Sequence, residues 1–215
     1  TPKPSSAASD VYKRQLLKSS IACKKGLLNY IHYIESHDDL LESYPIQIVS
    51  TGHSKVMVGI KNIATLNKMK PDYDALSRLS NIIKCNGYYV FTVDSQYSDI
   101  LVHGRMFAPA IGINEDPVTG NANGPLAAYL VHHKLINHNN FLFKFKAKQG
   151  EAIKRSGIIE VEVIIQNDEP AEVKISGNAV IVFKSELSLE WSSRMVTWNH
   201  FTRKEQLLFI WKTRL

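Results

Sequence analysis

Short stretches in which apolar and polar residues alternate dominate this sequence, and one markedly apolar helical segment lies among them. The helical segment, residues 124–135, places Leu126, Leu130 and Val131 on one apolar stripe. Many strands around one such helix favour a sheet that curls around the helix and buries it. We therefore predict an α+β fold with a mostly antiparallel, β-barrel-like sheet wrapped around a central helix. The strands are expected at residues 46–51, 55–60, 87–93, 101–107, 141–147, 158–165, 171–176 and 178–184.

The other segments divide the 215-residue chain into a central domain and two ends of different composition. Residues 71–84 predict a helix that opens with a proline, and residues 16–41 show helical spacing only in patches. Residues 1–15 are rich in Ser, Ala, Pro and Lys, so we expect a disordered leader of non-native origin. Residues 191–215 lack the alternation of the preceding strands. They are either a foreign tail or contain a short amphipathic helix around residues 203–212.

The positive charge of the chain is concentrated in these two ends. The net charge is +6, but residues 16–190 carry 18 basic and 18 acidic side chains. A neutral domain offers no electrostatic surface for a phosphate backbone, so we expect no nucleic-acid partner. No apolar run reaches the roughly 18 residues that span a bilayer, so no membrane association is expected either. The two cysteines, Cys23 and Cys85, show neither disulfide nor metal-ligand spacing, which indicates a reducing, cytoplasmic location.

Residues 108–120 predict a loop with the composition of an anion-binding site. Gly120 allows a ligand to approach the backbone closely, and Asn121 follows at the start of the predicted helix. The first N–H groups of a helix lack intrahelical partners and lie at the positive end of its dipole, so they can hold a carboxylate. Asp116, just before this turn, can exchange a proton with a ligand or bind its amine or hydroxyl group. The same pattern, Asp-Pro followed by Thr-Gly, is also common in turns and helix caps that have no function.

A longer stretch around this loop resembles the signature of the PhzF-like isomerases, a family named for phenazine biosynthesis. The shared positions are Arg105, Phe107, Pro109, Gly112, Glu115, Asp116, Pro117, Thr119, Gly120 and Ala122. Further similar segments extend the resemblance to residues 16–190. It implies a diaminopimelate-epimerase-like fold, in which two similar lobes, each a barrel-like sheet around a helix, hold the active site between them. Residues 16–190 then correspond to the C-terminal lobe, and residues 191–215 lie outside the resemblance.

The resemblance also implies roles for individual residues. Asp116 becomes the catalytic residue of this lobe, while Gly120, Asn121 and Ala122 bind the carboxylate of a small-molecule substrate. His53 is expected either to line the substrate-binding cleft or to have a structural role. The resemblance implies no metal and no cofactor at this site.

One departure from the family pattern affects the expected activity. The principal acid/base of the family is a glutamate in a Gly-His-Ser-Glu motif of the N-terminal lobe, whereas Lys55 follows Gly52-His53-Ser54 in this sequence. We therefore expect a fragment that lacks the N-terminal lobe as its partner and is inactive alone.

The predicted parent function is that of a cofactor-independent isomerase, which moves a proton on a small carboxylate-bearing substrate by general acid/base catalysis. Two alternatives stay open: an amino-acid racemase or epimerase, and a non-catalytic small-molecule-binding domain. A homodimer is a further option for assembly.

Overall fold

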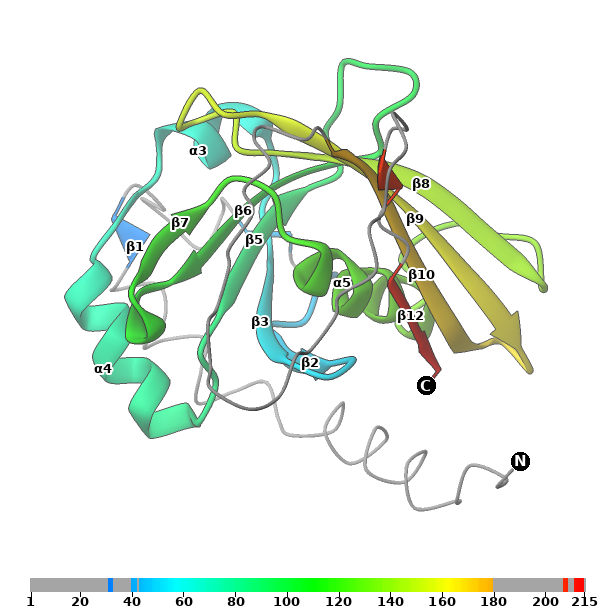
Figure 1. The fold of residues 1–215 in the computed structure, drawn as a ribbon, viewed down its shortest axis with the longest axis horizontal. Helices are drawn as coiled ribbons and strands as arrows, with labels where there is room; N and C mark the ends of the chain where they lie inside the picture. The colour runs from blue at the N-terminus through cyan, green and yellow to red at the C-terminus, as the bar shows by residue number, and fades with distance from the viewer. Residues whose placement is uncertain (1–30, 33–39, 42, 180–206, 209–210, 215) are drawn as a thin grey trace, which may run out of the picture.

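A computed structural model of the chain describes residues 31–32, 40–41, 43–179, 207–208 and 211–214, and most of these residues form one curled sheet around one helix (Figure 1). In chain order the strands of this sheet are β2 (Gln47–Ser50), β3 (Ser54–Gly59), β5 (Tyr88–Thr92), β6 (Val102–Ala108), β7 (Ile113–Asp116), β8 (Leu142–Gln149), β9 (Gly157–Gln166), β10 (Glu169–Ala179), β11 (Leu207–Leu208) and β12 (Trp211–Arg214). A separate small sheet pairs β1 (Ile31–His32) with β4 (Lys70–Pro71).

The strand order along the large sheet is β11-β10-β9-β8-β6-β5-β3-β2, with β7 paired to β6 and β12 paired to β10. The β3–β5 and β6–β8 pairings are parallel, and the other pairings of the described strands are antiparallel. The first residues of β6 pair with the end of β8, whereas Met106 and Ala108 pair with β7. Because β5 occupies the other edge of β6, β8 and β7 share one edge, and the sheet divides there.

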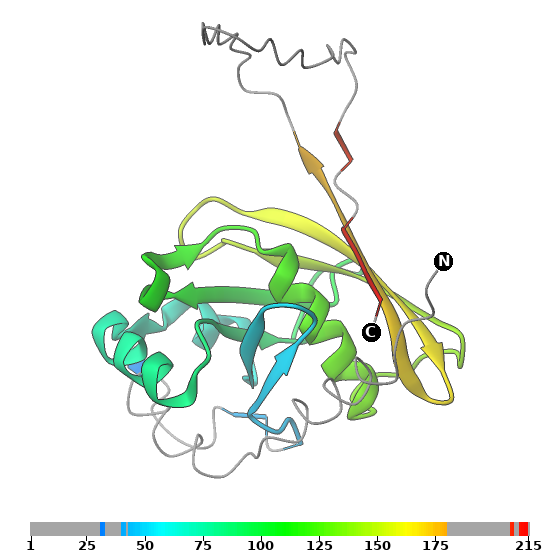
Figure 2. The ribbon, with the colours of Figure 1, turned by 60° about the horizontal axis from the view of Figure 1, so that its bottom comes forward.

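The helix α5 (Gly120–His132) fills the inside of the curved sheet. All ten of its residues from Ala122 to Val131 are buried, which accounts for the apolar composition of the segment. Figures 1 and 2 show α5 between β9 and β10 on one side and β2 and β3 on the other, and these four strands contact it. The predicted α+β fold with a mostly antiparallel sheet around a buried central helix is therefore confirmed.

Two further helices cover the opposite face of β3 and β5. They are α3 (Ile63–Lys68) and α4 (Tyr73–Ile83), and Leu66, Leu76 and Leu79 pack there against Val58 and Val90. The helix predicted over residues 71–84 is thus present, but it begins after the proline. The side chain of Asp72 caps it by accepting a hydrogen bond from the N–H of Ala75.

Four expectations about individual elements need correction. The predicted loop 108–120 contains a 3₁₀ helix, η2 (Pro109–Ile111), and the strand β7. The two strands expected at 171–176 and 178–184 form one strand, β10, as far as Ala179, and the rest lies outside the described residues. Of the residues considered for a helix over 203–212, those that the structure describes lie in the strands β11 and β12. Ile31–His32 is also a strand, within a segment whose patches suggested a helix.

The predicted leader, residues 1–15, lies outside the described residues. Within the described ranges, no helix has both the length and the apolar character needed to cross a membrane.

Candidate functional site

A cavity of about 560 Å³ opens at the N-terminal end of α5, and we call it the α5 cavity. Its lining residues are His53, Ser54, Lys55, Asn86, Met106, Ala108, Ile111, Ile113, Asp116, Val118, Thr119, Gly120 and Asn121. They come from the β2–β3 turn, the start of β5, β6, β7 and the first turn of α5. The start of α5 thus lies beside β6 and β7, at the point where the sheet divides, and the cavity opens there.

The first turn of α5 is not capped by the side chain that precedes it. Thr119 occupies the N-cap position, but its hydroxyl donates to Oδ2 of Asp116 at 2.5 Å and makes no capping hydrogen bond. The N–H groups of Ala122 and Asn123 both donate to the Thr119 carbonyl, each at 3.3 Å. Among the described residues, the N–H groups of Gly120 and Asn121 have no acceptor. Two donors at the positive end of the helix are thus available to a ligand.

Asp116 is fixed in position from both its side chain and its backbone. It ends β7, opposite Met106 of β6, and its carbonyl accepts a hydrogen bond of 2.6 Å from Nε2 of Gln149. With Oδ2 taken by Thr119, the described residues leave Oδ1 without a hydrogen-bond partner. This oxygen can accept a proton or a hydrogen bond from a molecule in the cavity.

A buried polar network connects this site to the core. Gln149 donates to Thr119 Oγ1 at 2.9 Å, and its Oε1 accepts from the Thr119 N–H at 3.3 Å and from Asn123 at 3.5 Å. The hydroxyl of Tyr89 donates to Oδ1 of Asn123 at 2.9 Å, and burial raises the pKa of Tyr89 far above its usual range. Gly104 makes this possible, because a Cβ at its position would collide with the Tyr89 hydroxyl. The network therefore holds the start of α5 through hydroxyl and amide groups that keep their protons at neutral pH.

A buried ion pair holds β7, and with it Asp116, against the rest of the sheet. Arg105 donates from Nε and Nη2 to the two carboxylate oxygens of Glu115 at 2.9 and 2.7 Å. Its Nη1 also donates to the carbonyls of Leu66 and Met69 at 2.9 and 2.8 Å. Both members of the pair are almost fully buried. They therefore position the neighbouring aspartate and do not themselves face the cavity.

The structure brings together four of the five residues that the sequence singled out. Asp116, Gly120, Asn121 and His53 line the α5 cavity, and His53 is exposed. Ala122 does not line it, because its side chain is fully buried in the core and its N–H donates to Thr119.

Sequence reasoning missed several lining residues, above all Lys55. It was noted only because a lysine follows Gly52-His53-Ser54, and nothing in a strand pattern says which face will line a cavity. Asn86 lies within residues 16–190, which the resemblance covers, but it had no assigned role. Both residues meet Asp116 only through the fold.

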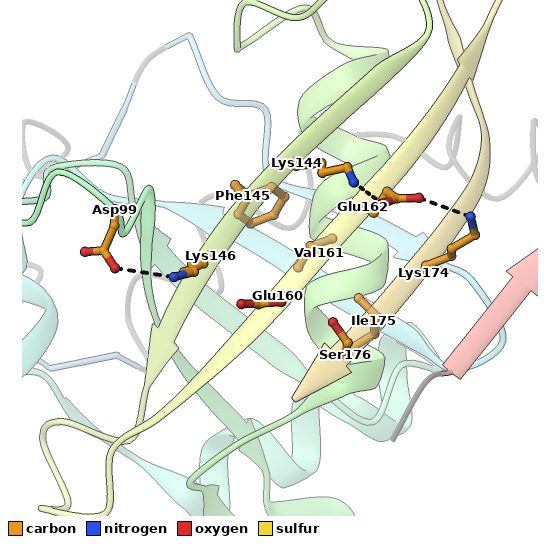
Figure 3. Close-up of a pocket in the computed structure, with 10 residues that line it drawn as sticks. All are labelled: Asp99, Lys144, Phe145, Lys146, Glu160, Val161, Glu162, Lys174, Ile175 and Ser176. Atoms are coloured by element: carbon orange, nitrogen blue, oxygen red, sulfur yellow. Dashed lines mark hydrogen bonds and ion pairs between the residues drawn. The ribbon is translucent and has the colours of Figure 1, made fainter. Parts of the chain in front are cut away.

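A second hollow, of about 530 Å³, lies on the outer face of β8, β9 and β10 (Figure 3). All its charged residues except Glu160 pair with one another: Lys144 and Lys174 contact Glu162 at 2.6 and 3.1 Å, and Lys146 contacts Asp99 at 3.5 Å. Charges that are already paired across strands favour a structural role for this surface.

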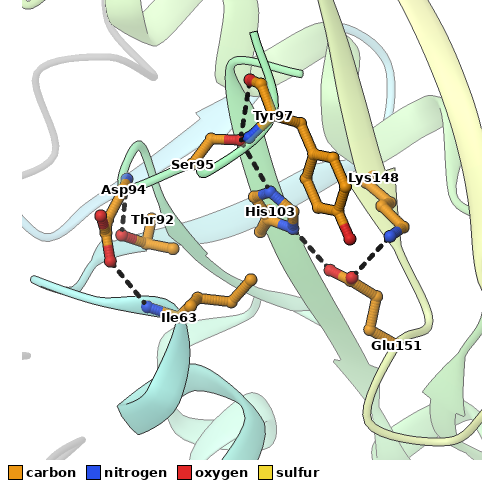
Figure 4. Close-up of polar contacts among 8 residues, drawn as sticks. All are labelled: Ile63, Thr92, Asp94, Ser95, Tyr97, His103, Lys148 and Glu151. Carbon is orange, nitrogen blue, oxygen red and sulfur yellow. Dashed lines mark hydrogen bonds and ion pairs between the residues drawn. The ribbon is translucent and has the colours of Figure 1, made fainter. Parts of the chain in front are cut away.

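A polar cluster near the start of β6 is also satisfied internally (Figure 4). His103 lies between Ser95 Oγ at 3.0 Å and Glu151 Oε2 at 2.5 Å, and Lys148 contacts Glu151 at 2.8 Å. The Ser95 hydroxyl also bonds the backbone of Tyr97, so the cluster anchors the loop between β5 and β6. The α5 cavity, with its unpaired donors, is the stronger candidate site.

The sequence is similar to known proteins over most of its length. A family model described as phenazine biosynthesis-like protein matches residues 19–185. An uncharacterized isomerase of Clostridium acetobutylicum is 73% identical over 166 residues, which are 77% of this chain and 54% of that protein. A trans-2,3-dihydro-3-hydroxyanthranilate isomerase of Pseudomonas chlororaphis is 33% identical over 139 residues, 64% of this chain and 46% of that protein. The chain thus spans about half the length of the curated relatives it matches.

The fold agrees with a solved structure of similar sequence. The crystal structure of a phenazine biosynthesis protein of the PhzF family from Bacillus anthracis matches with a TM-score of 0.61 and 26% identity. The match covers 75% of this chain and 52% of that structure. The lobe-like fold expected from the sequence is thereby confirmed.

Proposed function

The chain belongs to the phenazine biosynthesis-like (PhzF) family of isomerases, and from this premise we propose that the α5 cavity binds a small carboxylate substrate on which Asp116 moves a proton. The observation that carries the proposal is the pair of unpaired N–H groups, those of Gly120 and Asn121, in the cavity that Asp116 also lines. A carboxylate bound there replaces the missing cap of α5. No cofactor is part of the proposed reaction.

The arrangement of Asp116 suits a general acid/base. Moving a proton between two carbons requires a group within hydrogen-bond reach that accepts the proton and returns it. The Thr119 hydroxyl and Gln149 hold the aspartate so that Oδ1 is its available oxygen. Preorganisation of this kind reduces the reorientation needed during the reaction.

We further propose that a complete reaction needs the region of the relatives that this chain does not match. One carboxylate reaches one side of a substrate. Proton transfer between two positions of the substrate is assisted by a second acid/base group that lines the cavity. The chain alone is then expected to bind carboxylates and to exchange protons slowly or not at all.

The binding part of the proposal is tested with two substitutions at one position. Asn121→Ala removes a side chain, whereas Asn121→Pro removes the side chain and the N–H group that the helix does not use. We expect Asn121→Pro to weaken binding of small carboxylates about tenfold more than Asn121→Ala, measured by titration followed by NMR, because a charge-assisted hydrogen bond is lost. Equal affinities of the two folded variants for carboxylates would show that the start of α5 does not bind the ligand.

The catalytic part is tested by solvent-deuterium incorporation into trans-2,3-dihydro-3-hydroxyanthranilate and a panel of small amino acids. The chain is measured alone and after co-expression with the part of the Clostridium acetobutylicum relative that it does not match. We expect exchange only in the reassembled protein, and a loss of at least about 100-fold in Asp116→Asn. Asp99→Asn, outside the cavity, is the matched control.

The products decide between the alternative functions. Inversion at a carbon of an amino acid would identify a racemase or epimerase, whereas migration of a double bond would identify an isomerase of unsaturated acids. Tight binding without exchange in the reassembled protein would indicate a binding domain. Unchanged exchange in Asp116→Asn would contradict the assignment of Asp116.

A further inference from the structure

Lys55 is a buried cation in the α5 cavity. Its residue is 5% exposed, and it lines the same cavity as Asp116 and the start of α5. Its ammonium donates to the carbonyl of Ser54 at 3.3 Å, and the described residues place no carboxylate within ion-pair distance of it. A buried ammonium without a counter-charge is costly, so a partner for it is expected.

Other lysines of the described sheet show the usual solution. Lys144, Lys148 and Lys174 each contact a glutamate at 2.6 to 3.1 Å, although they are more exposed than Lys55. Lys55 interacts electrostatically with Cys85, but burial raises the pKa of that thiol, so the thiol is uncharged at neutral pH. Lys55 is therefore the cation of this cavity whose charge the described residues leave uncompensated.

The fold holds Lys55 in this position. A Cβ on Gly87 would collide with Cδ of Lys55, so the glycine of the Cys85-Asn86-Gly87 segment leaves the space in which the lysine lies. The β2–β3 turn that precedes it meets the first turns of α5, since a Cβ on Gly124 would lie 3.2 Å from Oγ1 of Thr51. The ammonium and the helix end are thus two cationic features of one cavity.

We propose that Lys55 binds a second anionic group of the substrate, so that the ligand of the α5 cavity is a small dicarboxylate. This inference rests on the proposed function, in which the N–H groups of Gly120 and Asn121 hold the first carboxylate. In this proposal one carboxylate accepts hydrogen bonds from those amides. A second carboxylate pairs with Lys55, and a cavity of about 560 Å³ has room for both groups.

The test compares two ligands that differ in one charge. Succinate carries two carboxylates, and succinamate replaces one of them with an amide of nearly the same shape. We expect the chain to bind succinate at least about tenfold more tightly than succinamate, measured by NMR titration at constant ionic strength. Lys55→Met keeps the length of the side chain without its charge and is expected to abolish this preference. Lys61→Met, at an exposed position outside the cavity, should retain it.

Each other outcome overturns the inference. Equal binding of the two ligands by the unmodified chain, or no binding of either, would do so. A succinate preference that persists in Lys55→Met, and in a second variant, Lys55→Gln, would place the second carboxylate elsewhere. A preference that disappears when the chain is reassembled with the unmatched part of its relative would show that Lys55 pairs with a carboxylate of that part.

The Asn121 and Lys55 variants distinguish failure of the proposed function from failure of this inference. If Asn121→Pro and Asn121→Ala bind succinate equally well, the helix-end site fails. If only the Lys55 variants behave unexpectedly, the helix-end site stands and the second anionic contact is absent.

Discussion

The buried charge of Lys55, which we propose to bind a ligand, should also destabilise the ligand-free lobe. Lys55 is buried against Gly87, where its side chain has lost most of its hydration. Burial lowers its pKa below the ordinary value of 10.5, with a smaller opposing effect from Cys85. A folded state that disfavours a proton is destabilised wherever that proton is bound in the unfolded chain.

We therefore expect Lys55→Met to stabilise the ligand-free chain. At neutral pH the melting temperature should rise by about 2–4 °C, which corresponds to about 1 kcal/mol for a protein of this size. The gain should shrink as the pH rises through the lowered pKa towards 10.5, because the unmodified lysine then loses its charge in the folded state. Differential scanning calorimetry at pH 7 and pH 10 measures both effects. A melting temperature below that of the Lys61→Met control would contradict the account.

The two kinds of signature residue have different roles at this scale. Asp116 and Gly120 line the cavity, whereas Arg105 and Glu115 hold β7 in place from within the protein. The sequence pattern contains all four but cannot separate their roles, because they lie in one segment. Only the position of each residue in the fold does so.

At the scale of elements, β8, β9 and β10 are aligned by opposite charges on their outer face. Glu162 stands opposite Lys144 on β8 and opposite Lys174 on β10, and it contacts both (Figure 3). Hydrogen bonds from Lys144 and then Lys174 hold the pKa of Glu162 below its ordinary value of 4.5. The register of three strands thus coincides with the pairing of their charges.

The stability from this pairing should depend on pH in a defined direction. A carboxylate with a lowered pKa stabilises the fold above its unfolded pKa, and this contribution disappears as the pH falls through the folded pKa. We expect Glu162→Gln to cost about 0.5–1 kcal/mol at pH 7 and progressively less below pH 4.5, measured by urea denaturation. Glu160→Gln, on the same face but without an ion pair among the described residues, is the control. An equal cost at pH 7 and pH 3 would show that the charge does not matter.

Periodic elements were predictable from the sequence, and elements held by individual contacts were not. The central helix and most strands bury a regular face, so their spacing is visible in the chain. β7 was missed because Ile113 is exposed and the strand is held by the contact between Arg105 and Glu115. β10 was divided at Gly177, but that residue pairs with Ile159 within the ladder.

The candidate site was predicted where local chemistry defines it and missed where the fold assembles it. A glycine before an apolar helix and an aspartate before that glycine can be recognised in one segment. Lys55 joins them from β3 and Asn86 from the loop before β5, and no local pattern predicts such a meeting.

At the scale of the whole molecule, apolar residues surround the mouth of the α5 cavity. Ile111, Ile113 and Val118 line the cavity and are 57%, 41% and 42% exposed. Exposed apolar residues that cluster at a site indicate a contact surface. The part of the relatives that this chain does not match, or a second copy of the chain, is the partner we expect there.

The chain alone should therefore self-associate through this rim. We expect the double variant Ile111→Ser and Ile113→Ser to reduce the apparent mass in sedimentation experiments at concentrations where the unmodified chain forms larger species. Ile82→Ser is the matched control, because Ile82 is 76% exposed on α4. Equal reduction by the control, or a monomeric unmodified chain, would contradict the role of the rim.

The hydrogen-bonded route from Tyr89 to Asp116 has a consequence for the order in which the molecule forms. It joins β5, α5, β8 and β7, and its contacts connect Tyr89 to Asn123 and Gln149 to Asp116, 34 and 33 positions apart along the chain. During synthesis, α5 can coil as soon as it is complete, but the residue that orients its first turn, Gln149, follows later. The start of the helix therefore acquires its final geometry only after β8 has been made and has joined β6. We expect the end of α5 at which we propose anion binding to be completed late in the folding of this lobe.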